Sequence, residues 1–131
     1  MQTIQGFIDR HGLTAEVDWA DSNPNMDDAR EMTHWLVTIH AEDRTMAVPF
    51  SQGLAHTGEP ELDDVLDCLA SDAATVDNAR SFEDWAGDLG YDEDSRRAYR
   101  TYEAIQRQAG ELRQLLGAED YETLLYSVER L

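Results

Sequence analysis

The chain has 131 residues, a length typical of one domain, and its 28 acidic side chains outnumber 10 basic ones, all arginine, giving a net charge of −18 at pH 7. No stretch approaches the roughly 18 apolar residues of a membrane span, the first ten residues lack a signal-peptide pattern, and a single cysteine excludes an internal disulfide. We therefore expect a cytoplasmic protein without a membrane or direct nucleic-acid partner, since so negative a chain repels both.

Residues 1–58 predict mainly β-sheet. Alternation of apolar and polar residues predicts strands over Leu13–Ala20, Thr33–His40 and Arg44–Ser51, joined as a three-stranded antiparallel meander. Pro49 cannot donate to a neighbouring strand, so the third strand is expected at an edge. The side chains expected to face the core are Leu13, Ala15, Val17, Trp19, Trp35, Val37, Ile39, Met46, Val48 and Phe50.

Residues 59–131 predict about four helices. The first runs from Glu61 to about Ala74, the second follows the N-cap Ser81 and stops at Gly90, the third is long and ends at Leu116, and the last covers about Glu119–Arg130. The pattern predicts a single α+β domain over residues 1–131, with the sheet packed against a helical layer.

Sequence motifs for catalysis or cofactor binding are lacking. The chain has no glycine-rich phosphate loop and no nucleophile elbow, and Cys68, beside acidic residues and an apolar stripe, is interpreted as a small core residue. The runs Asp63-Asp64-x-x-Asp67 and Asp92-Glu93-Asp94 do not match a calcium loop. We therefore expect no catalytic residues, no metal site and no cofactor, and a protein that is not an enzyme.

The acidic residues are concentrated in one segment. Residues 59–94 hold thirteen acids and one base, Arg80, whereas residues 95–131 hold six of each. Residues three and four apart on a helix are neighbours, so two helices carry short acidic rows, and two such rows side by side would resemble a phosphate backbone. The predicted partner is a basic nucleic-acid-binding protein or complex. The predicted binding residues are Asp63, Asp64, Asp67, Glu83, Asp84, Asp88, Asp92, Glu93 and Asp94.

A family resemblance adds a candidate partner. Residues 64–117, above all Ser81-Phe-Glu-Asp-Trp85 and the segment Gly90–Arg96, resemble a group of small phage and prophage proteins, and the similarity extends over about residues 24–125. Some similar phage proteins are anti-CRISPRs, and several anti-CRISPRs are DNA mimics. The resemblance implies a phage-encoded anti-defence protein in the cytoplasm of the host bacterium. It would inhibit a type I CRISPR effector complex by binding its DNA-binding surface.

Three other interpretations compete with this one. The acidic rows are also what solvated helix faces look like, with acids favoured near helix N-termini. The chain could be a phage regulatory or adaptor protein with an apolar interface, for example a homodimer through the region of Tyr99, Tyr102 and Tyr121. It could also be a housekeeping domain of a halophile, in which acids cover the whole surface. The sequence leaves the oligomeric state, monomer or homodimer, open.

Overall fold

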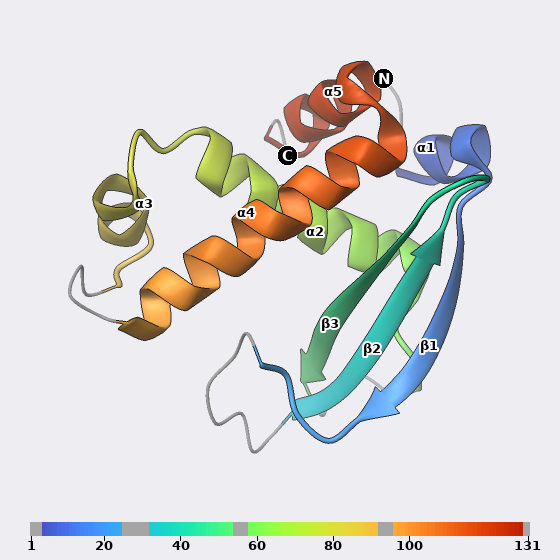
Figure 1. Ribbon diagram of the computed structural model, residues 1–131, viewed down its shortest axis with the longest axis horizontal. Helices are drawn as coiled ribbons and strands as arrows, with labels where there is room; N and C mark the ends of the chain where they lie inside the picture. Colours follow the sequence, from blue (N-terminus) through green and yellow to red (C-terminus); the bar gives the residue numbers. More distant parts are fainter. Residues whose placement is uncertain (1–3, 25–31, 54–57, 92–95, 130–131) are drawn as a thin grey trace.

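The computed structural model describes residues 4–24, 32–53, 58–91 and 96–129 and places a sheet beside a layer of helices (Figure 1). This α+β arrangement is the one that the sequence predicts. In chain order the elements are α1 (Ile4–His11), β1 (Thr14–Ala20), β2 (Met32–His40), β3 (Thr45–Gly53), α2 (Leu62–Asp77), α3 (Phe82–Asp88), α4 (Arg96–Leu116) and α5 (Ala118–Glu129).

The sheet is the predicted three-stranded antiparallel meander. Its order is β1-β2-β3, so β3, which contains Pro49, is an edge strand as expected. Val37 is the Cα partner of Val17 on one side and of Val48 on the other, which aligns apolar side chains across one face. Since side chains alternate along a strand, this register turns one apolar face toward the helices.

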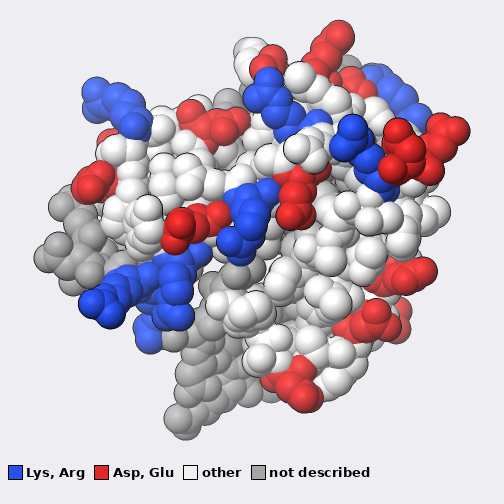
Figure 2. Space-filling model, in the orientation of Figure 1, with Lys and Arg blue, Asp and Glu red and all other residues white. Residues whose placement is uncertain are grey.

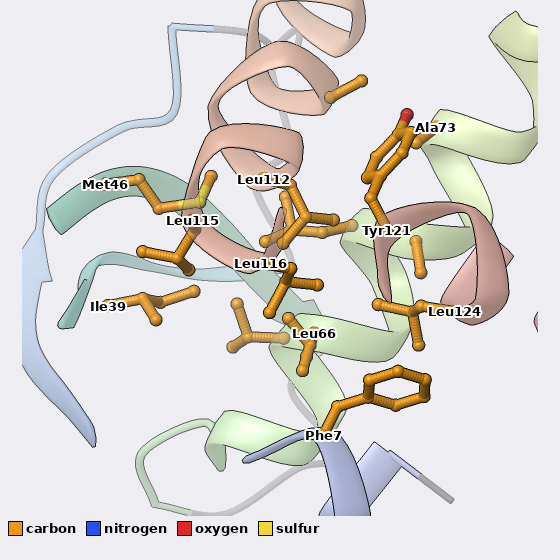
Figure 3. Packing of buried hydrophobic residues seen from close by; sticks show 14 of the residues in the cluster. Phe7, Ile39, Met46, Leu66, Ala73, Leu112, Leu115, Leu116, Tyr121 and Leu124 are labelled. Carbon is orange, nitrogen blue, oxygen red and sulfur yellow. The ribbon is translucent and has the colours of Figure 1, made fainter. Parts of the chain in front are cut away.

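Helices α4 and α2 cover that apolar face, and α5 packs on α2 and α4. Leu66 of α2, Leu112 of α4 and Leu124 of α5 are fully buried, as are Val37 and Ile39 of the sheet. Figure 3 shows the α4 leucines pointing between the sheet residues and the side chains of α2 and α5. Burying each such side chain contributes about 1.5–3 kcal/mol, which the sheet alone, with this face exposed to water, would not gain. The helices therefore hold the sheet in place.

Helix α1 was not predicted, because the sequence pattern indicated mainly strands in residues 1–58. Eight residues are too few for a stable isolated helix, and the segment has no acidic residue in its first turn. Its signal was the spacing of Ile4, Phe7 and Ile8, and the last two are buried in the main core. Gly12, with φ 59°, ends the helix in a conformation that favours glycine. The helix is therefore stabilised by its packing against the main core and not by its local sequence.

Helix α3 begins and ends as the sequence predicts. Ser81 is the N-cap, and its Oγ accepts a hydrogen bond from the backbone N–H of Asp84 at 3.2 Å. The carboxylate of Asp84 accepts from the backbone N–H of Arg80 at 3.0 Å, one residue before the usual partner in a capping box. Gly90 follows the helix with φ 78° and stops it.

A second, smaller buried cluster joins α3 to α2 and α4. It contains Val76, Trp85, Ala86, Ala98 and Ile105, and it is separate from the main core. None of the helices within the described ranges has the length and hydropathy needed to cross a membrane.

The three tyrosines considered as a dimer interface do not form one surface. Tyr121 is only 4% exposed and belongs to the main core, whereas Tyr102 packs against the smaller cluster and Tyr99 is exposed. That version of the apolar interface was wrong, because helical periodicity does not reveal which face of α5 the core covers.

The contact between α1 and α5 yields a first prediction. Asp120 accepts hydrogen bonds from Arg10 at 2.8 Å and from His11 at 2.6 Å. Desolvation alone would raise the pKa of Asp120, but these two bonds outweigh it and hold the pKa below its ordinary value. Asp120→Asn is expected to lower the free energy of unfolding at pH 7 by about 1–2 kcal/mol, less than for a buried charge pair because Arg10 is 45% exposed.

Urea unfolding at several pH values measures this effect. Because the folded-state pKa is lowered, the stabilisation is present above the ordinary carboxyl pKa and disappears as the pH falls through the folded value. The wild type and Asp120→Asn should therefore converge in acid. Glu119→Gln, at the neighbouring exposed position in the same helical turn, is the control. An equal loss in both variants would attribute the effect to the helix dipole.

Tyr121 yields a second prediction. Burial, with the charge of Asp77 3.4 Å from the phenol oxygen, raises the pKa of Tyr121 to about 12. The folded state favours the neutral phenol, so its contribution is complete below pH 10 and is lost as the pH rises toward 12. Denaturant unfolding at pH 9 and pH 11.5 should show a loss of about 1–2 kcal/mol that is absent in Tyr121→Phe. An identical alkaline loss in both proteins would contradict the assignment.

Candidate functional site

The predicted acidic residues of α2 lie in its first two turns. Asp63 and Asp64 are exposed and Asp67 is half-buried, while Val65 and Leu66 between them enter the core. The apolar stripe thus fixes the direction of the acids, which point away from the main core. Asp63 accepts a hydrogen bond from the backbone N–H of Asp64 at 2.9 Å, a local contact near the helix N-terminus.

The acids of α3 lie around a short helix that Trp85 anchors. Trp85 is 1% exposed, and its indole N–H donates to the hydroxyl of Thr75 on α2 at 3.1 Å. Glu83 and Asp88 are exposed on the outside of the helix, and Asp84 is half-buried by its capping contact. With the three acids of α2, they form what we call the α2–α3 acidic surface: Asp63, Asp64, Asp67, Glu83, Asp84 and Asp88.

The two acidic rows do not lie side by side. The α2 acids occupy its first two turns, and α3 lies beyond its other end (Figure 1). The ten residues of α2 that follow Asp67 cover about 15 Å of helix axis, so much of α2 separates its acids from those of α3. Asp92, Glu93 and Asp94, the third predicted group, lie outside the described residues.

Carboxylates on this surface lack ion-pair partners among the described residues. None of the six forms an ion pair with an arginine or histidine there, although Arg80 lies beside the acids of α3. On the face drawn in Figure 2, which carries α4, arginine side chains lie among the acids.

Three carboxylates lie close together near the start of α2. Glu61, Asp63 and Asp64 bring one oxygen each within 4.8 Å of one another, and all three side chains are exposed. Exposed acids often approach one another in this way without holding an ion. Desolvated ligands with further hydrogen-bond partners, typical of a dedicated site, are lacking at this group among the described residues.

A cleft of about 380 Å³ lies between β3, α2, α3 and α4. It runs along the seam between the main core and the smaller cluster, and its walls include Leu69 from the first and Trp85 and Ile105 from the second. Its size falls in the lower part of the roughly 300–1,000 Å³ range of ligand pockets. The sequence analysis did not identify this cleft, since only the packing of four elements creates it.

Asp72 is the one charged residue lining the cleft within the described chain, and it was not among the predicted site residues. Its backbone carbonyl accepts from the hydroxyl of Thr75 at 2.6 Å, whereas its carboxylate has no partner among the described residues. The side chain is exposed as a whole, but its carboxyl is partly desolvated by the wall, which raises the pKa of Asp72. The available signal was the spacing of Cys68, Asp72 and Thr75, which puts them on one face of α2.

Cys68 lies on the cleft wall and is exposed, so the prediction of a core position was wrong. The apolar stripe of α2 passes beside Cys68 through Leu69 and leaves the thiol at the rim. Desolvation raises the pKa of the Cys68 thiol, and the carboxylates of Asp72, Asp67 and Asp64 raise it further. An activated nucleophile needs the opposite shift.

Comparisons with known proteins found no match. No protein-family model matches it, and neither a curated protein nor a solved structure is significantly similar to it.

The environment of Cys68 yields a third prediction. At pH 8 the native thiol is expected to react with iodoacetamide, a neutral reagent, more slowly than the same thiol in urea-unfolded protein, because only the thiolate reacts. A variant with Asp64→Asn, Asp67→Asn and Asp72→Asn should react faster than the wild type.

A matched variant with Asp18→Asn, Glu42→Gln and Glu122→Gln serves as the control, since it removes the same charge at exposed positions outside the cleft walls. Equal rates in both triple variants would show that the nearby carboxylates do not govern the thiol.

Proposed function

We propose that this protein binds the basic nucleic-acid-binding surface of another protein through the α2–α3 acidic surface and keeps nucleic acid away from it. The observation that carries the proposal is the set of six carboxylates without ion-pair partners among the described residues. A cationic partner surface would supply the missing charges. Such binding is fast, because the field steers the partner, and it weakens with salt.

The arrangement of charge supports a local binding surface. The ion pairs that the structure does form lie elsewhere, where Asp120 binds Arg10 and His11 between α5 and α1, and Glu16 lies 3.6 Å from His40 on the sheet. Residues 59–94 contribute a net charge of −12, and residues 95–131 contribute none. A charge excess that served solubility alone would not need this separation.

The presence of two separate acidic groups, one on α2 and one on α3, supports mimicry of a duplex over mimicry of one strand, because a duplex presents two rows of phosphates. Within each group, helical spacing puts the carboxylates of neighbouring turns about 5–6 Å apart at their Cβ atoms. A protein surface shaped to hold DNA would meet both groups at once.

The family resemblance gives the partner. We propose an anti-defence role in which the protein occupies the DNA-binding surface of a type I CRISPR effector complex. A regulatory or adaptor protein would instead bind its partner through an apolar interface, and that binding would not depend on salt. A halophile housekeeping domain would instead need high salt to stay folded.

A DNA-binding assay with purified type I effector complexes tests the proposal. The wild-type protein is expected to displace target DNA, and displacement should weaken between 50 and 500 mM salt as the Debye length shortens to a few ångström. A variant of the α2–α3 acidic surface, with all six acids changed to their amides, should need at least about tenfold more protein, or ~1.4 kcal/mol.

The control variant carries the same loss of six charges at exposed positions outside α2 and α3, and it should inhibit like the wild type. Its positions are Asp18, Glu42, Asp43, Glu103, Glu111 and Glu122. If both variants lose inhibition equally, net charge and not a local surface is responsible. If the wild type displaces no DNA from any of the type I effector complexes, the proposed partner is wrong.

Circular dichroism in 20 mM and 2 M salt tests the halophile alternative. A halophile domain would be unfolded in 20 mM salt and folded in 2 M salt, whereas the proposed function expects the same folded spectrum in both.

A further inference from the structure

The cleft between the two buried clusters combines an apolar interior with one negative wall. Its lining includes apolar side chains from three elements, such as Val48 of β3, Leu69 of α2 and Ile105 of α4. The only charged residue that lines it within the described chain is Asp72. Basic residues are absent from the lining as described, so nothing there neutralises this carboxylate.

Two further acids lie on α2 near Asp72. Asp64 and Asp67 precede it on the helix and do not line the cleft. Desolvation raises the pKa of the Cys68 thiol on the cleft wall, and the charges of Asp72, Asp67 and Asp64 raise it further, so the surroundings of this wall are negative. An uncompensated, partly desolvated carboxylate costs free energy that a bound cation would recover.

Aromatic rings form the end of the cleft at α3. Trp85 and Tyr91 stack with their centroids 5.3 Å apart and their planes at 17°, and both line the cleft. Tyr91 is 45% exposed, so its ring is accessible from solvent. A planar cation gains from lying over such rings, and a guanidinium does so better than an ammonium because it is flat and weakly hydrated.

We infer that this cleft is the anchor point for a partner arginine, whose side chain would enter along the apolar walls and place its guanidinium between Asp72 and the Trp85–Tyr91 pair. The inference rests on the proposed function, since it takes the arginine from the basic surface that the α2–α3 acidic surface attracts. The acids would steer the encounter, and the cleft would give the complex a buried contact. Binding energy at interfaces is concentrated at such contacts, where arginine is enriched.

The cleft is large enough for more than one side chain. At about 380 Å³ it can hold an arginine together with part of its backbone and solvent. A short peptide with one arginine is therefore a suitable probe, and acetyl-Gly-Arg-Gly-amide is the probe of choice. The same peptide with citrulline, which is nearly isosteric and uncharged, isolates the contribution of the charge.

Nuclear magnetic resonance of ¹⁵N-labelled protein gives the readout. The indole N–H of Trp85 donates to Thr75 beside the cleft, whereas Trp19 is not among the cleft-lining residues and serves as an internal reference. The arginine peptide is expected to shift the Trp85 indole signal with a Kd of the order of 1 mM, as suits so small a ligand, and to leave Trp19 unchanged. The citrulline peptide should bind at least tenfold more weakly.

Two variants make the test specific. Asp72→Asn should weaken the arginine peptide at least fivefold while the protein stays folded, because the contact between Thr75 and Asp72 uses the backbone carbonyl. Glu122→Gln removes one charge from α5, which does not line the cleft, and should bind like the wild type. Equal binding of the citrulline peptide, or equal binding by Asp72→Asn, would overturn the inference. So would a lysine peptide that binds as tightly as the arginine peptide.

The remaining outcomes separate this inference from the proposed function. If the protein displaces DNA from an effector complex and Asp72→Asn does so equally well, the acidic surface acts alone and the anchor is wrong. If the arginine peptide binds the cleft and no effector complex releases DNA, the proposed function fails and arginine recognition by the cleft stands. A Trp85 signal that shifts with protein concentration alone would assign the cleft to an arginine of a second copy and overturn the assignment to a different partner.

Discussion

The structure depends on the burial of one apolar sheet face. Three strands of seven to nine residues leave one apolar face open to water, and their inward side chains are buried only when α2 and α4 lie across them. The fully buried Val37, Leu66 and Leu112 come from β2, α2 and α4, so the core cannot form until segments far apart in the chain meet. This requirement also recruits α1, whose eight residues are helical only against the core.

The same burial decides where the charge goes. Once the apolar stripe of α2 faces the sheet, the acids of α2 lie on the outer side of the helix. Like charges three and four residues apart repel one another and so destabilise the helix that carries them. The chain tolerates this cost with a single arginine, Arg80, beside the acids of α3 and with no ion pair to any of the six acids among the described residues, although α4 carries five arginines. A surface that keeps an unfavourable field over two helices is suited to a partner with the opposite field.

The cleft follows from having two buried clusters instead of one. Trp85 gathers α3, the end of α2 and the start of α4 into a small core of its own, and the seam between that core and the main one leaves room for solvent. Asp72 lies on this seam. Its carboxylate is therefore in an apolar setting without a counter-ion among the described residues, which a sequence of many similar aspartates does not reveal. Steering by exposed acids and anchoring in a cleft are different physical tasks, and in the function proposed above adjacent regions of the fold would perform them.

The amino-acid sequence by itself determined the local order of this protein. Alternation fixed three strands and most of their inward faces, although Trp19, expected on the inner face of β1, is 64% exposed. Ser81 and Gly90 fixed the limits of α3, because each of these signals acts within a few residues. Tertiary packing alone decided the rest: that Ile4–His11 is a helix, that Cys68 is exposed, that Tyr121 is buried, and that the acids of α2 and α3 lie apart with a cleft near Asp72. These features depend on which face of an element meets which neighbour, and that choice is made by the burial of the whole apolar surface and not by any local pattern.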